Sequence, residues 1–128
     1  MLPRVASVFV ACGIAVAVLS AQAPADLTGQ LARATALYDD GKYSDALKSF
    51  MAASESPEAS TALAARKGTV LAALRVGEFT VARRAASILS THEADAEALT
   101  LSGDALWAAG FFDEADQDYA RALVVDPR

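Results

Sequence analysis

A short series of glycine, aromatic and alanine residues occurs three times in the chain and restricts its fold more than any other feature. The third copy begins at Gly110, the middle copy at Gly77, 33 residues earlier, and the first copy at Gly41, a further 36 residues upstream. A series that returns at such intervals is typical of stacked helical units, each of which buries its apolar face on a neighbour. The equivalent residues are Gly41, Tyr43, Ala46 and Phe50; Gly77, Phe79, Ala82 and Ala86; and Gly110, Phe112, Ala115 and Tyr119.

Residues 99–127 contain the third copy and predict two antiparallel helices. Gly103 lets the backbones of the paired helices approach closely, and Gly110 ends the first helix where a left-handed residue is needed. Ala115 fits beneath the first helix, where a larger side chain would not. Pro127 then ends the second helix, because proline lacks the backbone donor that a longer helix would need.

The small, aromatic and turn residues of this segment resemble the tetratricopeptide repeat (TPR) family. They are Leu99, Ser102, Gly103, Leu106, Gly110, Phe111, Phe112, Ala115, Tyr119, Ala122 and Pro127. Leu99 stands where that family most often has tryptophan, and Leu106 where it has tyrosine, but both remain apolar. The resemblance implies an all-α fold, an α-solenoid of about three TPR-like helix-turn-helix hairpins, with repeats over about 27–56, 57–93 and 94–128.

The composition favours one helical domain over residues 26–128. The chain is 54% hydrophobic with few aromatic residues, and it lacks the alternation of a half-buried strand. Its net charge of −5 argues against nucleic acid as a partner, because a phosphate-binding surface needs a basic excess. Cys12 is the single cysteine, so the sequence provides neither a disulfide framework nor a cysteine-pair metal site.

Residues 1–25 have the three parts of an export signal. Arg4 supplies a positive start, residues 5–19 are apolar or small without a charge, and residues 21–23 have the small-x-small form of a cleavage site. Because Pro24 is expected to hinder cleavage directly after Ala23, the alternative cut lies after Ala25. The expected location is the periplasm or another extracytoplasmic space.

Two other interpretations of this segment remain open. Residues 5–23 supply 19 uncharged residues, enough for an uncleaved membrane anchor whose N-terminus Arg4 would hold on the cytoplasmic side. In the other interpretation Cys12 is a lipidation site, although the apolar stretch continues for seven residues beyond the cysteine, where lipoprotein sequences usually turn polar.

Caps and turn residues predict the bounds of the helices. We expect helices over about 26–39, from after Lys42 to near Ser54, over 57–76 and over 79–90, followed by a linker at 91–95 and the last hairpin. Ser56 is expected to cap the third of these helices, with Pro57 at its first helical position and Glu58 at the positive end of its dipole.

The longer spacing between the first two copies leaves the register of the middle repeat open. If the additional residues lie in the loop from Ser54 to Pro57, Val70 occupies the place that Gly103 has in the third repeat. If they lie in the turn from Arg75 to Gly77, Gly68 occupies it.

No sequence motif for catalysis or for a cofactor occurs in the chain. Glycine-rich phosphate loops, HExxH-type metal motifs, Gly-x-Ser-x-Gly turns and dinucleotide fingerprints are all missing, so we expect no enzyme activity, no cofactor, no catalytic residue and no metal site. His92 has no convergent partners in the sequence and is expected to be solvated. The four acidic residues at the start of the last helix are expected to complement its dipole and to face water; they are Asp113, Glu114, Asp116 and Asp118.

By resemblance to TPR proteins, the first helix of each hairpin lines a concave face. With the additional residues placed in the loop, the residues on this face are Leu31, Thr35, Tyr38 and Asp39; Lys67, Leu71, Leu74 and Arg75; and Glu97, Thr100, Asp104, Trp107 and Ala108. Aromatic residues at both ends and two cations in the middle suit an extended peptide, or a helix that bears an acidic residue. The candidate partner-binding residues are Tyr38, Lys67, Leu71, Arg75, Asp104 and Trp107.

The resemblance also excludes one known specificity, and several alternatives stay open. A clamp for chaperone-tail carboxylates needs basic and asparagine side chains where this chain has Leu31 and Thr35. In one alternative Tyr38 and Trp107 only cover joints between helices. The chain could instead be an accessory module of a longer enzyme or envelope assembly factor. It could also be a structural subunit that self-associates through its C-terminal hairpin, where residues 122–125 are apolar.

Overall fold

The computed structural model describes residues 24–92 and 95–128, and these residues form six α-helices and no strand. The helices are α1 (Pro24–Asp39), α2 (Tyr43–Ala53), α3 (Ala59–Val76), α4 (Phe79–His92), α5 (Ala96–Ala108) and α6 (Phe112–Val125). The all-α fold predicted from the sequence is therefore confirmed. Residues 1–23, which include Cys12 and most of the segment predicted at 1–25 as an export signal or anchor, lie outside the described residues.

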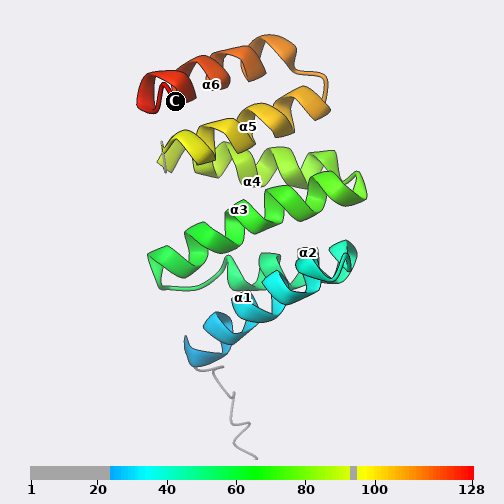
Figure 1. Ribbon diagram of the computed structural model, residues 1–128. Coiled ribbons are helices and arrows are strands. Elements are labelled where there is room, and N and C mark those ends of the chain that lie inside the picture. Colours follow the sequence, from blue (N-terminus) through cyan, green and yellow to red (C-terminus); the bar gives the residue numbers. More distant parts are fainter. Residues whose placement is uncertain (1–23, 93–94) are drawn as a thin grey trace, which may run out of the picture.

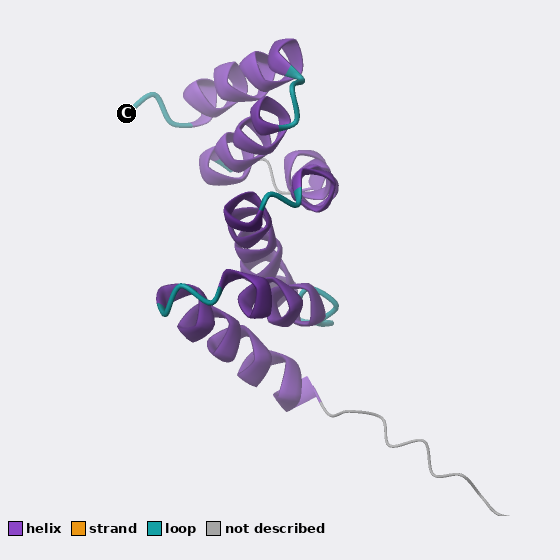
Figure 2. Ribbon diagram, turned by 90° about the vertical axis from the view of Figure 1, so that its right-hand side faces the viewer, coloured by secondary structure: helices purple, strands orange, loops and turns teal. Residues whose placement is uncertain are grey.

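The six helices are stacked in chain order along the length of the molecule, from α1 to α6 (Figure 1). Each helix packs on the next, and α3 also contacts α1 and α5. Figure 2, turned by 90°, again places α1 and α6 at opposite ends of the stack. The first helices of successive hairpins thus lie next to one another, so residues more than 30 positions apart can share one surface.

The three hairpins turn in the same way. Each turn glycine has a positive backbone φ angle, which residues other than glycine rarely adopt. The φ angle is 76° at Gly41, 79° at Gly77 and 85° at Gly110. The amide after each glycine donates to a carbonyl five residues back, which is the Schellman end of a helix. These bonds are Lys42 to Leu37 at 2.8 Å, Glu78 to Ala73 at 2.9 Å and Phe111 to Leu106 at 2.9 Å.

The equivalent turns decide the register of the middle hairpin. Because the Gly77 turn has the same hydrogen bonds as the other two, no additional residue lies in it, and counting back from each glycine makes Val70 the equivalent of Gly103. Gly68 serves a different contact. A β-carbon at Gly68 would overlap the ring of Phe50, so Gly68 lets α3 approach the preceding hairpin.

The core consists mainly of small side chains, which allow the helices to lie close together. Its larger buried side chains are those of Leu47, Phe50, Val70, Leu89, Leu99 and Leu101. The buried alanines are Ala34, Ala46, Ala53, Ala62, Ala65, Ala72, Ala73, Ala82, Ala85, Ala86, Ala98, Ala105, Ala115 and Ala122.

The start of α3 differs from the prediction. The helix begins at Ala59, so Pro57 precedes it, and the N-cap residue is Glu58. The Ser56 hydroxyl accepts a hydrogen bond from the Glu58 amide at 3.2 Å, and Ser56 lies two residues before the N-cap position, so it does not cap the helix itself. The Glu58 carboxylate accepts from the hydroxyls of Thr61 at 2.7 Å and Ser60 at 2.8 Å, and these bonds lower its pKa.

Candidate functional site

An open groove of about 530 Å³ lies between α1 and α3. Its lining is mostly apolar and includes three hydroxyl-bearing and two charged side chains. The residues are Leu31, Thr35, Tyr38, Phe50, Ser60, Leu63, Ala64, Lys67, Gly68, Leu71 and Glu97. The groove therefore brings together three of the six candidate site residues, Tyr38, Lys67 and Leu71, and six of the residues predicted for the concave face.

Tyr38 of the groove lining belongs to a cluster of aromatic rings. The Tyr38 ring meets Tyr43 edge to face, with centroids 5.1 Å apart, and Phe50 in the same way at 6.5 Å. Arg75 joins this cluster from α3. Its Nε donates to the Tyr38 hydroxyl at 3.3 Å, and its guanidinium lies 5.6 Å from the centroid of the Tyr43 ring. The candidate residue Arg75 thus adjoins the groove by contact with Tyr38.

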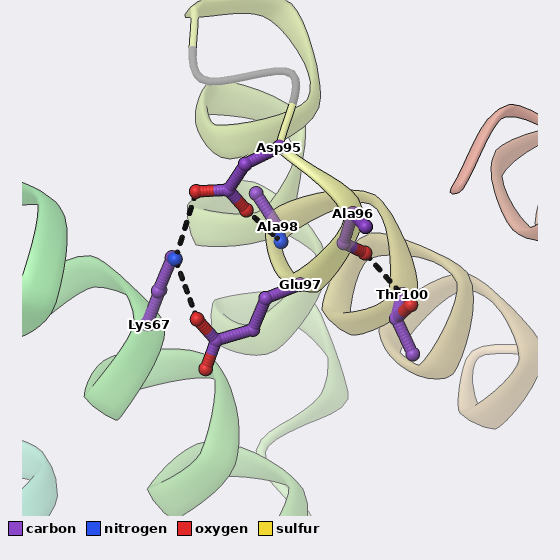
Figure 3. A network of polar contacts seen from close by, with 6 residues as sticks. All are labelled: Lys67, Asp95, Ala96, Glu97, Ala98 and Thr100. Carbon is purple, nitrogen blue, oxygen red and sulfur yellow. Dashed lines mark hydrogen bonds and ion pairs between the residues drawn. The ribbon is translucent and has the colours of Figure 1, made fainter. Parts of the chain in front are cut away.

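Lys67 and Glu97 of the groove lining belong to an ion-pair network centred on Lys67 (Figure 3). The Lys67 ammonium lies 2.6 Å from Glu97 and 3.0 Å from Asp95, so α3 is tied to the start of α5. Asp95 is also the N-cap of α5, and its other carboxylate oxygen accepts from the Ala98 amide at 2.7 Å. The Lys67 side chain is only 16% exposed, whereas those of Asp95 and Glu97 are 49% and 67% exposed.

This network changes the pKa of two of its members. Desolvation at Lys67 lowers the pKa of its ammonium, but the hydrogen bonds and charges of Glu97 and Asp95 outweigh it and leave the pKa raised. Desolvation at Asp95 raises the pKa of its carboxyl, but the Ala98 amide and Lys67 together lower it below its usual range. Lys67 is therefore charged and already paired within the chain, and two partly exposed carboxylates surround it.

Two candidate residues lie away from the groove lining. Trp107 is near the end of α5 with 60% of its surface exposed, and its ring meets that of Phe112 edge to face at 5.8 Å. Asp104, one turn earlier, accepts a hydrogen bond from the Tyr119 hydroxyl at 2.8 Å. Counted back from the turn glycine, Trp107 is the equivalent of Tyr38, so it extends the same series of positions to the third hairpin.

A second hollow, of about 570 Å³, lies between α4 and α6. Its charges are mixed, with Arg83 and Arg84 on one side and Glu114 and Asp118 on the other. Asp118 is buried, which corrects the prediction that all four acidic residues of α6 face water. It lies on the side of α6 that faces α5, where it accepts from the Ser102 hydroxyl at 2.6 Å, and it pairs with Arg121 at 2.7 Å.

The described residues do not assemble a metal site, since residues 24–92 and 95–128 contain no cluster of three or more potential ligands. Within these same two ranges, no helix is both long and apolar enough to cross a membrane. Comparison of the sequence with models of known families and with curated proteins finds no match. Among the described residues, the groove between α1 and α3 is the surface that brings together three of the predicted site residues, and the proposed function is built on it.

Sequence reasoning missed the partners of Lys67. Asp95 and Glu97 lie 28 and 30 residues further along the chain, close to one repeat length. That spacing is the signal by which they could have been found, because residues about one repeat apart become neighbours on adjacent first helices.

Proposed function

We propose that the chain is an exported α-solenoid of three TPR-like hairpins that binds a peptide or helix of a partner protein in the groove between α1 and α3. The observation that carries the proposal is the shared lining of this groove. Leu31 and Tyr38 on α1 and Leu71 on α3 lie along one open, largely apolar surface, although the chain separates them by up to 40 residues. A surface of this kind fits one side of an amphipathic segment.

The solenoid assignment is supported by the three equivalent turns and by the helices that follow one another in chain order. The export assignment has its support in the sequence of residues 1–25. Intact-mass analysis of protein recovered from an exporting host tests export. Loss of residues 1–23 or 1–25 is expected, whereas Met1 still attached in the membrane fraction would mean that residues 5–23 form an anchor.

The groove is tested by selecting peptides from a displayed library on the immobilised chain and titrating a selected peptide against two variants. Leu71→Glu places a charge in the apolar lining, and we expect at least a tenfold loss of affinity, equivalent to about 1.4 kcal/mol. Ile88→Glu is the matched control, because Ile88 is 40% exposed and Leu71 38%, but Ile88 lies on α4. Equal affinities of the two variants would exclude the groove.

Trp107 tests how far the binding surface extends along the first helices. If a bound segment continues from the groove to α5, Trp107→Ala weakens binding by about 1–4 kcal/mol, as expected for an aromatic interface anchor. Because Trp107 is mostly exposed, the helicity of the variant should equal that of the parent. Unchanged affinity would restrict the site to α1 and α3.

A further inference from the structure

The C-terminal end of α6 has an apolar surface that the other second helices lack at the same positions. Leu123, Val124 and Val125 are 62%, 85% and 53% exposed. The equivalent residues, counted forward from each turn glycine, are Ser90, Thr91 and His92 after Gly77 and Ser54, Glu55 and Ser56 after Gly41. The repeat itself does not require apolar residues at these positions. The exposed apolar residues of α6 therefore indicate a surface to which another segment or molecule binds.

Within the chain, the first helix of one hairpin covers the end of the hairpin before it in two places, where α3 follows α2 and where α5 follows α4. In α3 and α5, residues twelve, nine and five positions before the turn glycine are small or apolar and buried; they are Ala65, Gly68 and Ala72 in α3 and Ala98, Leu101 and Ala105 in α5. Gly68 lies against Phe50 of the preceding hairpin, and the three residues of α5 belong to the core cluster shared with the first two hairpins. These residues therefore form the face by which a first helix docks on the hairpin before it.

The same face on α1 is exposed. Gly29, Ala32 and Ala36 occupy the three equivalent positions, and all three are exposed, although α1 is otherwise packed on α2 and α3. The exposed face of α1 thus corresponds to a face that α3 and α5 each bury on the hairpin before them, and α6, at the other end of the described stack, ends in exposed apolar residues. We propose that α1 of a second copy docks on α5 and α6 of the first, so that the chains associate head to tail.

Charge supports this arrangement. Arg33 of α1, which is exposed, is the equivalent of Ser102, and Ser102 lines a hollow together with Arg83 of the preceding hairpin. The residue of α6 equivalent to Arg83 is Asp116, also exposed. In the head-to-tail complex, Arg33 of one copy therefore faces Asp116 of the other, and the two charges are opposite. This contact does not involve the lining of the groove between α1 and α3, so its test is independent of the proposed peptide binding.

A head-to-tail contact leaves one end free on each side and produces a growing series of oligomers instead of a closed dimer. Sedimentation of the full chain over a wide range of concentration should show that series. Leu123→Lys blocks the α6 end and Ala32→Lys blocks the α1 face, and both sites are exposed, so the fold should be retained. Each variant alone should raise the dissociation constant at least tenfold, whereas Ile88→Lys should leave it unchanged.

Mixing the two blocked variants is the decisive step, because each retains the end that the other has lost. The mixture should form a one-to-one heterodimer and nothing larger. Arg33→Glu should weaken assembly, and adding Asp116→Arg to the same chain should restore it. All variants carry the same residues 1–23, so differences between them report on the two ends. A parent that stays monomeric, or association blocked by Leu123→Lys but not by Ala32→Lys, overturns the proposal.

Discussion

Gly68 of α3 lies so close to the ring of Phe50 in α2 that a β-carbon does not fit between them. The Phe50 side chain is 5% exposed and belongs to the core cluster, so an added methyl group at position 68 has to displace a largely packed ring. This contact joins the second helix of one hairpin to the first helix of the next. The stacking of these two hairpins is therefore sensitive to a single methyl group at position 68.

Gly68→Ala should destabilise the chain, because the added methyl group overpacks a filled core. Overpacking of this kind costs about 1–3 kcal/mol. Gly29→Ala is the control, since nothing lies within 4 Å of its added β-carbon and alanine is the better helix former. Urea unfolding of the two variants measures the difference. A Gly68→Ala chain as stable as the parent would mean that α2 and α3 are not packed as closely as described.

A second pair of substitutions tests the packing within a hairpin. Ala115 of α6 is fully buried, whereas Ala120 of the same helix is exposed. Ala115→Leu should cost about 1–3 kcal/mol, whereas Ala120→Leu should have little effect. Equal melting temperatures for the two variants would contradict the register of the third hairpin.

The turns could be predicted from the sequence because their chemistry is local. A glycine that ends a helix in the left-handed region is recognisable at Gly41, Gly77 and Gly110 without any knowledge of the tertiary structure. Local sequence signals did not decide which residue of α3 is the equivalent of Gly103 in α5. Gly68 and Val70 both fit the sequence pattern, and the choice between them depends on hydrogen bonds at the Gly77 turn.

The site was less predictable because its polar groups form hydrogen bonds and ion pairs with residues of other helices. Lys67 was expected to be available to an acidic partner, but Asp95 and Glu97 already neutralise it. Asp118 was expected in water, but it lies against Ser102 of α5. Spacing along one helix identifies which face a residue occupies. It does not identify the side chain that the neighbouring helix places opposite.

The network around Lys67 should make stability depend on pH at the acidic end. The pKa of Asp95 is lowered in the folded chain from 3.8, so its contribution is present above that pH and is lost as pH falls through the folded-state pKa. Asp95→Asn retains a capping group without the charge, and near neutral pH it should cost roughly 0.2–1 kcal/mol, as for a solvent-exposed ion pair. Thermal unfolding near neutral pH and below pH 3.8 measures this, and the difference from the parent should shrink in acid.

Tyr119 should make stability depend on pH at the alkaline end. Desolvation of the ring, the hydrogen bond to Asp104 and the charges of Asp104 and Asp116 raise the pKa of Tyr119 from 10.0 to about 12. The folded chain favours the neutral phenol, so this contribution is complete below pH 10.0 and is lost as pH rises through about 12. Subtracting the ultraviolet absorbance titration of the Tyr119→Phe variant from that of the parent gives the ionisation curve of the Tyr119 phenol. Asp104→Asn should move its midpoint down.

Site-specific photocrosslinking in an exporting host tests whether a partner protein binds in the groove between α1 and α3. A photoreactive residue at position 35, on the groove lining, should give a defined adduct with the partner. The same residue at position 87, in the hollow between α4 and α6, serves as the control. If the partner binds in the groove, Leu71→Glu should abolish the adduct at position 35, and Ile88→Glu should not. An adduct only at position 87, or one at position 35 that survives Leu71→Glu, would contradict binding in the groove.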